Sequence, residues 1–104
     1  MTQEELDTLT EAIVSRRVVH LSYRSNPGQR TFHPHAIFES QDGQLHLDGL
    51  QTAGPTRDPH PLPIWRTFLL PTLTDIETTD TNFIPDARFN PRNTRKYHRM
   101  IVNC

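Results

Sequence analysis

The sequence lacks the residue patterns that identify several large classes of protein. Its single cysteine, Cys104, has no partner within the 104 residues, which excludes an internal disulfide framework and a cysteine-based zinc site. No run of apolar residues approaches the length of a membrane span, and the polar, acidic start is unlike a signal peptide. We therefore expect a cytoplasmic protein without a membrane segment.

Motifs for catalysis are also missing. The chain contains no nucleophile elbow, no Gly-rich phosphate loop and no paired-carboxylate motif. The two imidazoles of His33-Pro34-His35 could bind zinc together with His20 or His46, but the proline between them can turn them apart, and we favour polar strand residues or anion contacts. We expect neither enzyme activity nor a metal or other cofactor.

Hydrophobic residues make up only 34% of the chain, and nine residues are prolines. A domain of this length buries a modest core. Basic residues number six against eleven acidic ones up to Asp80, and five against one after it. We expect residues 1–80 to form the folded body and residues 81–104 to form an extended basic tail without a fold of its own. Phe83 and Phe89 would anchor this tail on its own body or on a second subunit, and both alternatives remain open.

The periodicity of apolar residues predicts one helix followed by short strands. Thr2-Gln3-Glu4-Glu5 has the form of a capping box, and apolar residues at helical spacing follow it to about Arg17. Alternation of apolar and polar residues begins at Val18, and turn signals lie at residues 25–28 and 41–43. The expected strands are residues 18–24, 30–39, 44–51, 64–70 and 73–79, with a last edge strand at 97–102. Mainly β structure of this kind fits a small antiparallel barrel, closed or nearly closed.

Arg66 is a charged residue on an apolar strand face, because the alternation places it on one face with Phe68 and other apolar side chains. A guanidinium keeps its charge and is seldom buried without a partner. Arg66 therefore needs water, an anionic ligand or an ion pair, for which Asp48 and Glu39 are candidates. The residues alone leave these alternatives open.

Four segments, taken in order after the helix, resemble the WYL domain family over about residues 11–83. They are Arg17-Val18-Val19-x-Leu21-x-Tyr23, Arg30-x-x-x-Pro34-His35, Gly43-x-Leu45-His46-Leu47 and Arg66-x-Phe68-x-Leu70. The resemblance implies an Sm-like or SH3-like β-barrel. It also assigns ligand binding to Tyr23, His35 and Arg66, with Arg30 as a further candidate. Pro71-Thr72 stand where the family has a second arginine.

Members of this family usually follow a helix-turn-helix in bacterial transcription regulators, where they are thought to sense a nucleotide-like or nucleic-acid ligand. The 104 residues leave no room for a helix-turn-helix, so we expect a divergent, stand-alone form. Its function would be non-enzymatic sensing of an anionic ligand, a nucleotide or a short nucleic acid, together with a transcription regulator or a defence system. The alternative is an oligomerising interaction module, a homodimer for example, or an Sm-like RNA-binding protein.

The basic tail offers a second candidate for nucleic-acid binding. Its arginines would follow the phosphates of a single strand, and its aromatic residues would stack on the bases. The residues concerned are Arg92, Arg95, Lys96, Tyr97 and Arg99. A solvated tail, or one docked on its own body, is the simpler interpretation.

Overall fold

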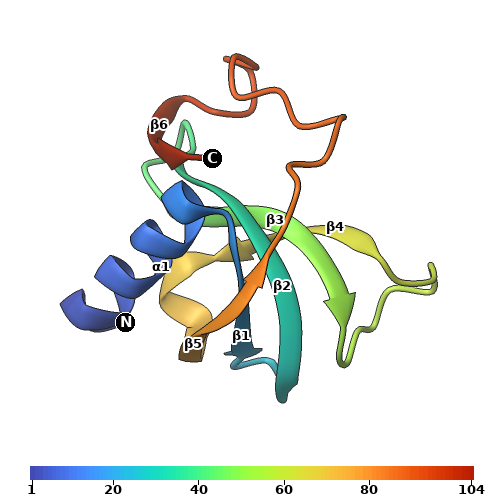
Figure 1. Ribbon diagram of the computed structural model, residues 1–104. Helices are drawn as coiled ribbons and strands as arrows, with labels where there is room; N and C mark the ends of the chain where they lie inside the picture. The colour runs from blue at the N-terminus through green and yellow to red at the C-terminus, as the bar shows by residue number, and fades with distance from the viewer.

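The computed structural model describes all 104 residues and consists of one helix and six strands (Figure 1). The elements are α1 (Gln3–Ser15), β1 (Arg17–Tyr23), β2 (Asn26–Glu39), β3 (Leu45–Ala53), β4 (Ile64–Leu69), the 3-10 turn η1 (Leu70–Thr72), β5 (Leu73–Asn82) and β6 (Arg99–Asn103). Every strand pair is antiparallel, and the order across the sheet is β4-β3-β2-β1-β5, with β6 also paired to β2. The fold is therefore mainly β, as the periodicity predicts.

The sheet does not close into the barrel that we expected. β4 pairs only with β3, and β5 pairs only with β1, so both ends of the strand path remain unpaired. Closure would require hydrogen bonds between the two end strands. The chain instead passes from β4 to β5 through η1, in which Pro71 has no N–H to donate. The result is an open, curved sheet that α1 covers on one side (Figure 1).

The helix begins at the predicted capping box. The Glu5 N–H donates to Thr2 Oγ1 at 3.1 Å, and the Thr2 N–H donates to Glu5 Oε1 at 3.0 Å. The helix ends at Ser15, where Arg16 adopts a left-handed conformation with φ 57°, so Arg17 already belongs to β1. Leu9 and Ile13 are completely buried against the sheet.

α1 is the only α-helix, and no helix of the structure is long enough to span a membrane.

The first hairpin differs from its prediction in the position of the turn. Tyr23 pairs with Asn26, so the turn lies at Arg24 and Ser25, and β2 includes the proline and glycine that we expected in the turn. The register of β2 against β3 shifts between Pro34 and Ala36, as expected for a proline within a strand. β6 covers residues 99–103 where we expected 97–102.

Two residues of β4, Phe68 and Trp65, show how the sheet separates its two faces. The Phe68 ring packs on Phe32, with 5.5 Å between ring centroids, in the core beneath α1. Trp65 has the opposite parity in β4, and its ring contacts Phe89 of the tail, with 6.0 Å between centroids. One face therefore packs in the core, and the segment between β5 and β6 covers the other.

Residues 83–98 form no helix or strand but pack closely on this second face. Phe83 is buried and stacks on His33, with 5.1 Å between ring centroids. Phe89 contacts His35, and the buried Tyr97 contacts Phe38. The basic tail therefore docks on its own body, which adds aromatic area to a core that is poor in apolar residues.

Candidate anion-binding site

Arg30 and Arg66 place their guanidinium groups against the same aromatic ring. The Cζ atoms of Arg30 and Arg66 lie 5.3 and 5.4 Å from the centroid of Phe68. Arg30 Cζ also lies 5.4 Å from the ring of Tyr23, which is itself 5.2 Å from the Phe68 ring. Strands β1, β2 and β4 thus bring two cations and two aromatic rings into one cluster.

Arg30 is fully buried within this cluster. Its Nη1 donates to Oε1 of Gln51 at 3.3 Å, its Nη2 donates to the carbonyl of Asn26 at 3.2 Å, and its Nε has no hydrogen-bond partner. Burial lowers the pKa of Arg30, and the nearby charge of Arg66 lowers this pKa further. The group still stays protonated at neutral pH, because a guanidinium does not lose its proton in proteins.

Arg66 is half-buried and stands between Arg30 and the loop of residues 54–63. Its Nη1 donates to Oγ1 of Thr56 at 2.8 Å. Asp58 in the same loop forms no ion pair with it. The pKa of Asp58 is lowered mainly by hydrogen bonds from His60, and only weakly by the charge of Arg66.

Neither guanidinium of the cluster forms an ion pair, since the ion pairs of the structure involve other residues. Asp48, one carboxylate that we considered for Arg66, pairs with Lys96 Nζ at 2.7 Å. Glu39, the other, pairs with Arg99 at 2.6 Å. The cluster therefore carries two positive charges without a compensating carboxylate, which is the arrangement that an anion would stabilise.

His35 does not join the other residues of the expected site. It packs on Trp65 and Phe89, on the opposite face of the sheet. Its Nδ1–H donates to the carbonyl of His33 at 2.8 Å, and its Nε2 accepts the Asp86 N–H at 2.9 Å. Burial lowers the pKa of His35, so the neutral ring that these two bonds require is favoured.

The basic residues of the tail divide into two groups. Lys96 and Arg99 are held in ion pairs with the body, and the Tyr97 hydroxyl donates to Asp48 Oδ2 at 2.8 Å. Arg92 and Arg95 are exposed, and their side chains contact no carboxylate or hydrogen-bond partner.

Two residues of the cluster escaped the sequence reasoning. Gln51 orients Arg30 and is itself buried, with its amide donating to the carbonyl of Pro55 at 3.0 Å. Thr56 holds Arg66 from a loop rich in proline, where no periodicity indicates which side chain faces the sheet. The position of Gln51 on the strand face of Leu47 and Gly49 was the one available signal.

The family model of the WYL domain matches residues 4–78 of the chain. This span contains Tyr23, Arg30 and Arg66 and ends before the segment that docks on the second face. No curated protein and no solved structure gives a significant match.

Proposed function

The chain belongs to the WYL domain family, and we propose that it is a regulatory module that senses an anionic ligand at Arg30 and Arg66. Ligand sensing in a regulatory setting is the general function of such domains. The finer statement, that an anion is the ligand and that these two arginines bind it, rests on the site itself.

The observation that carries the proposal is the pair of guanidinium groups at Phe68 without a carboxylate. Removing a charge from water costs several kcal/mol even after the protein relaxes, and a second like charge nearby adds to this cost. Proteins usually offset such a cost with an ion pair, and here the two carboxylates considered from the sequence, Asp48 and Glu39, pair with other residues. A bound anion would offset it in their place.

The chemistry of the site favours a phosphate group. The planar fork of Arg66 suits bidentate contact with phosphate oxygens, and the residue is only partly buried. The Thr56 hydroxyl lies at its Nη1, and the Tyr23 ring offers a flat surface next to Arg30. A nucleotide or the end of a short nucleic acid combines a phosphate with a planar base, so these are the ligands that we propose. We propose no catalytic role for the cluster. A sensor of this kind would report ligand binding through a partner regulator.

Isothermal titration with pyrophosphate, mononucleotides, cyclic dinucleotides and short single strands tests this proposal. Arg66→Met should raise the Kd of a binding anion by about tenfold or more, since hydrogen bonds to a charged group contribute roughly 1.5–3 kcal/mol. Arg66→Lys keeps the charge but loses the fork, and should have an intermediate effect. Arg95→Met is the matched control, because it removes one charge from an exposed arginine of the tail. An equal loss in Arg66→Met and Arg95→Met, or binding of no anion, would contradict the proposal.

One observation favours the alternative of an oligomerising module. β4 and β5 each present an edge without a strand partner, and such edges can pair with a second copy of the chain. Sedimentation at several protein concentrations distinguishes the two functions, because ligand sensing at Arg66 does not require a dimer. A stable dimer whose mass and melting temperature no anion alters would favour the oligomerising module.

A further inference from the structure

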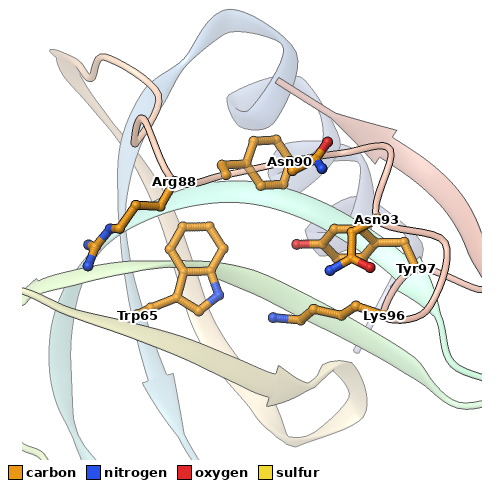
Figure 2. Close-up of a pocket in the computed structure, with 7 residues that line it drawn as sticks. Trp65, Arg88, Asn90, Asn93, Lys96 and Tyr97 are labelled. Carbon is orange, nitrogen blue, oxygen red and sulfur yellow. The ribbon is translucent and has the colours of Figure 1, made fainter.

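A concave site lies on the other face of the sheet from Arg30 and Arg66, between β4 and the docked tail (Figure 2). Its volume is about 280 Å³. The residues that line it are Trp65, Arg88, Phe89, Asn90, Asn93, Lys96 and Tyr97. Trp65 is the only one of them that lies within the residues matched by the family model. The pocket therefore depends on the tail of this particular chain.

We propose that this pocket binds a nucleobase, carried either by a free nucleotide or by a single-stranded nucleic acid. The proposal does not depend on the anion site, because Trp65 and Arg66 are neighbours in β4 and point to opposite faces of the sheet.

Aromatic rings form the walls of the pocket. The rings of Trp65 and Phe89 are nearly parallel, with 25° between their planes and 6.0 Å between centroids. The Tyr97 ring stands across from Phe89 at 69°, with 6.1 Å between centroids. Stacking of a base on such rings contributes roughly 1–3 kcal/mol. The exposed parts of these rings therefore form an apolar surface on which a planar heterocycle can stack.

The pocket has little net charge of its own, although Arg88 and Lys96 line it. Arg88 is paired with Asp86 at 3.0 Å. The Lys96 side chain extends toward Trp65, and its Nζ lies 5.7 Å from the Trp65 ring centroid (Figure 2). The same Nζ pairs with Asp48, which is fully buried beneath the pocket. Because the carboxylate neutralises this ammonium, the pocket suits an uncharged planar group better than a free cation or a bare anion.

Two carboxamides complete the chemistry. Asn90 Oδ1 accepts the Arg92 N–H at 3.0 Å, which leaves its amide N–H groups without a protein partner. The Asn93 side chain has no protein partner, while its backbone N–H donates to the Asn90 carbonyl at 3.1 Å and fixes the turn. An asparagine carboxamide can donate to and accept from the edge of a base at the same time, as it does with adenine. The two asparagines thus stand where the edge of a stacked base would need partners.

The size and surroundings of the pocket agree with a single base. Ligand sites of drug-sized molecules measure about 300–1,000 Å³, so a pocket of about 280 Å³ holds one ring system and leaves the sugar and phosphate outside. Arg92 and Arg95 belong to the same turns that carry Asn90 and Asn93, and both are exposed and unpaired. They can attract the phosphates that remain outside the pocket.

Fluorescence of Trp65 tests the proposal directly, because it is the only tryptophan and lines the pocket. Adenosine monophosphate and a short oligodeoxyadenylate should each be titrated, with correction for their absorbance, and we expect saturable quenching by at least one of them. Asn93→Ala should raise the Kd at least about fivefold, since a bidentate base contact is worth roughly 1–3 kcal/mol. Asn103→Ala, an exposed asparagine on β6, is the matched control and should leave the Kd unchanged.

Several results separate this site from the anion site and from tail unfolding. Arg66→Met should not change the quenching, whereas it should raise the Kd of an anion at the anion site by about tenfold or more. Phe89→Leu keeps apolar packing against His35 but removes the ring, and should weaken quenching without loss of the folded state. Saturation by the oligonucleotide alone assigns the pocket to a nucleic-acid strand, and equal saturation by the mononucleotide assigns it to the base itself. The absence of saturable quenching by both, or equal affinities of Asn93→Ala and Asn103→Ala, would overturn the proposal.

Discussion

Arg30 and Arg66 lie against the same ring, that of Phe68, although they come from strands at different places in the sheet. Two guanidinium groups in this position repel each other, and Arg30 has lost all contact with water. On the proposed function, an anion that binds here would offset part of this cost. The cluster therefore gives a physical basis for the proposed response of the domain to an anionic ligand.

The tail is held to the sheet by a buried carboxylate, which gives a first prediction. The Tyr97 hydroxyl donates to Asp48, and burial together with this hydrogen bond raises the pKa of Tyr97. Tyr97→Phe removes the hydroxyl alone and should lower the free energy of unfolding by roughly 1.5–3 kcal/mol, the contribution of a hydrogen bond to a charged group. Tyr23→Phe is the matched control, because its hydroxyl makes no such bond. Urea denaturation measures the loss of unfolding free energy in both variants. Equal losses in the two variants would show that the hydrogen bond to Asp48 does not hold the tail.

The free energy of unfolding should fall as the pH falls below the ordinary pKa of histidine. Burial lowers the pKa of His33 and His35 in the folded protein below 6.5, so the unfolded chain binds protons first. The stability that these neutral rings contribute is complete above about pH 6.5 and is lost as the pH falls toward their folded values. Protonation of His35 also removes the acceptor for the Asp86 N–H.

Urea denaturation at a series of pH values measures this dependence. His35→Gln should reduce the slope of unfolding free energy against pH, and His98→Gln, at an exposed histidine, should leave it unchanged. Asp86 should not contribute in this range, because hydrogen bonds from Arg88 lower its pKa to about 2. A slope that is the same in wild type and in His35→Gln would contradict this assignment.

Gly49 is required by the close approach of two strands. A Cβ atom at this position would lie 2.2 Å from the carbonyl oxygen of His33 and 2.6 Å from the Phe32 ring. Gly49→Ala should therefore cost about 2 kcal/mol or more of unfolding free energy, in the range of overpacked cores. Gly43→Ala meets no neighbouring atom and should cost only about 1 kcal/mol for its positive φ. Thermal unfolding of both variants measures the two losses of stability. A loss in Gly49→Ala that is equal to or smaller than the loss in Gly43→Ala would contradict this prediction.

Most elements of the fold are predictable from local sequence. The capping box marks the start of α1, and the alternation from Val18 onward marks the strands, because both signals depend on residues close together in the chain. Barrel closure is not a local property. It depends on whether β4 and β5 meet, and the periodicity of the two strands says nothing about this. The position of the first turn was wrong for a similar reason, since the pairing of Tyr23 with Asn26 decided it.

The residues of the site were predictable only in part. The parity of β4 correctly places Arg66 beside Phe68, but the approach of Arg30 depends on the register of β1 and β2, in which Leu21 faces Arg30. The alternation within β2 already puts Arg30 and His35 on opposite faces, because their numbers differ in parity. The resemblance grouped the two together, whereas the structure separates them. The pocket beside Trp65 could not be predicted from local signals, since it forms only when the tail docks.

The measurement that tests ligand sensing most directly is thermal unfolding in increasing pyrophosphate at constant ionic strength, with wild type and Arg66→Met side by side. A ligand at about 100 times its Kd stabilises the folded state by about 2.7 kcal/mol, which raises the Tm of a domain of this size by about 10 °C or more. We predict this rise for the wild type and for Arg95→Met, and little or none for Arg66→Met. A wild-type Tm that pyrophosphate does not change, or an equal rise in Arg66→Met, would contradict the assignment of the anion site to Arg30 and Arg66.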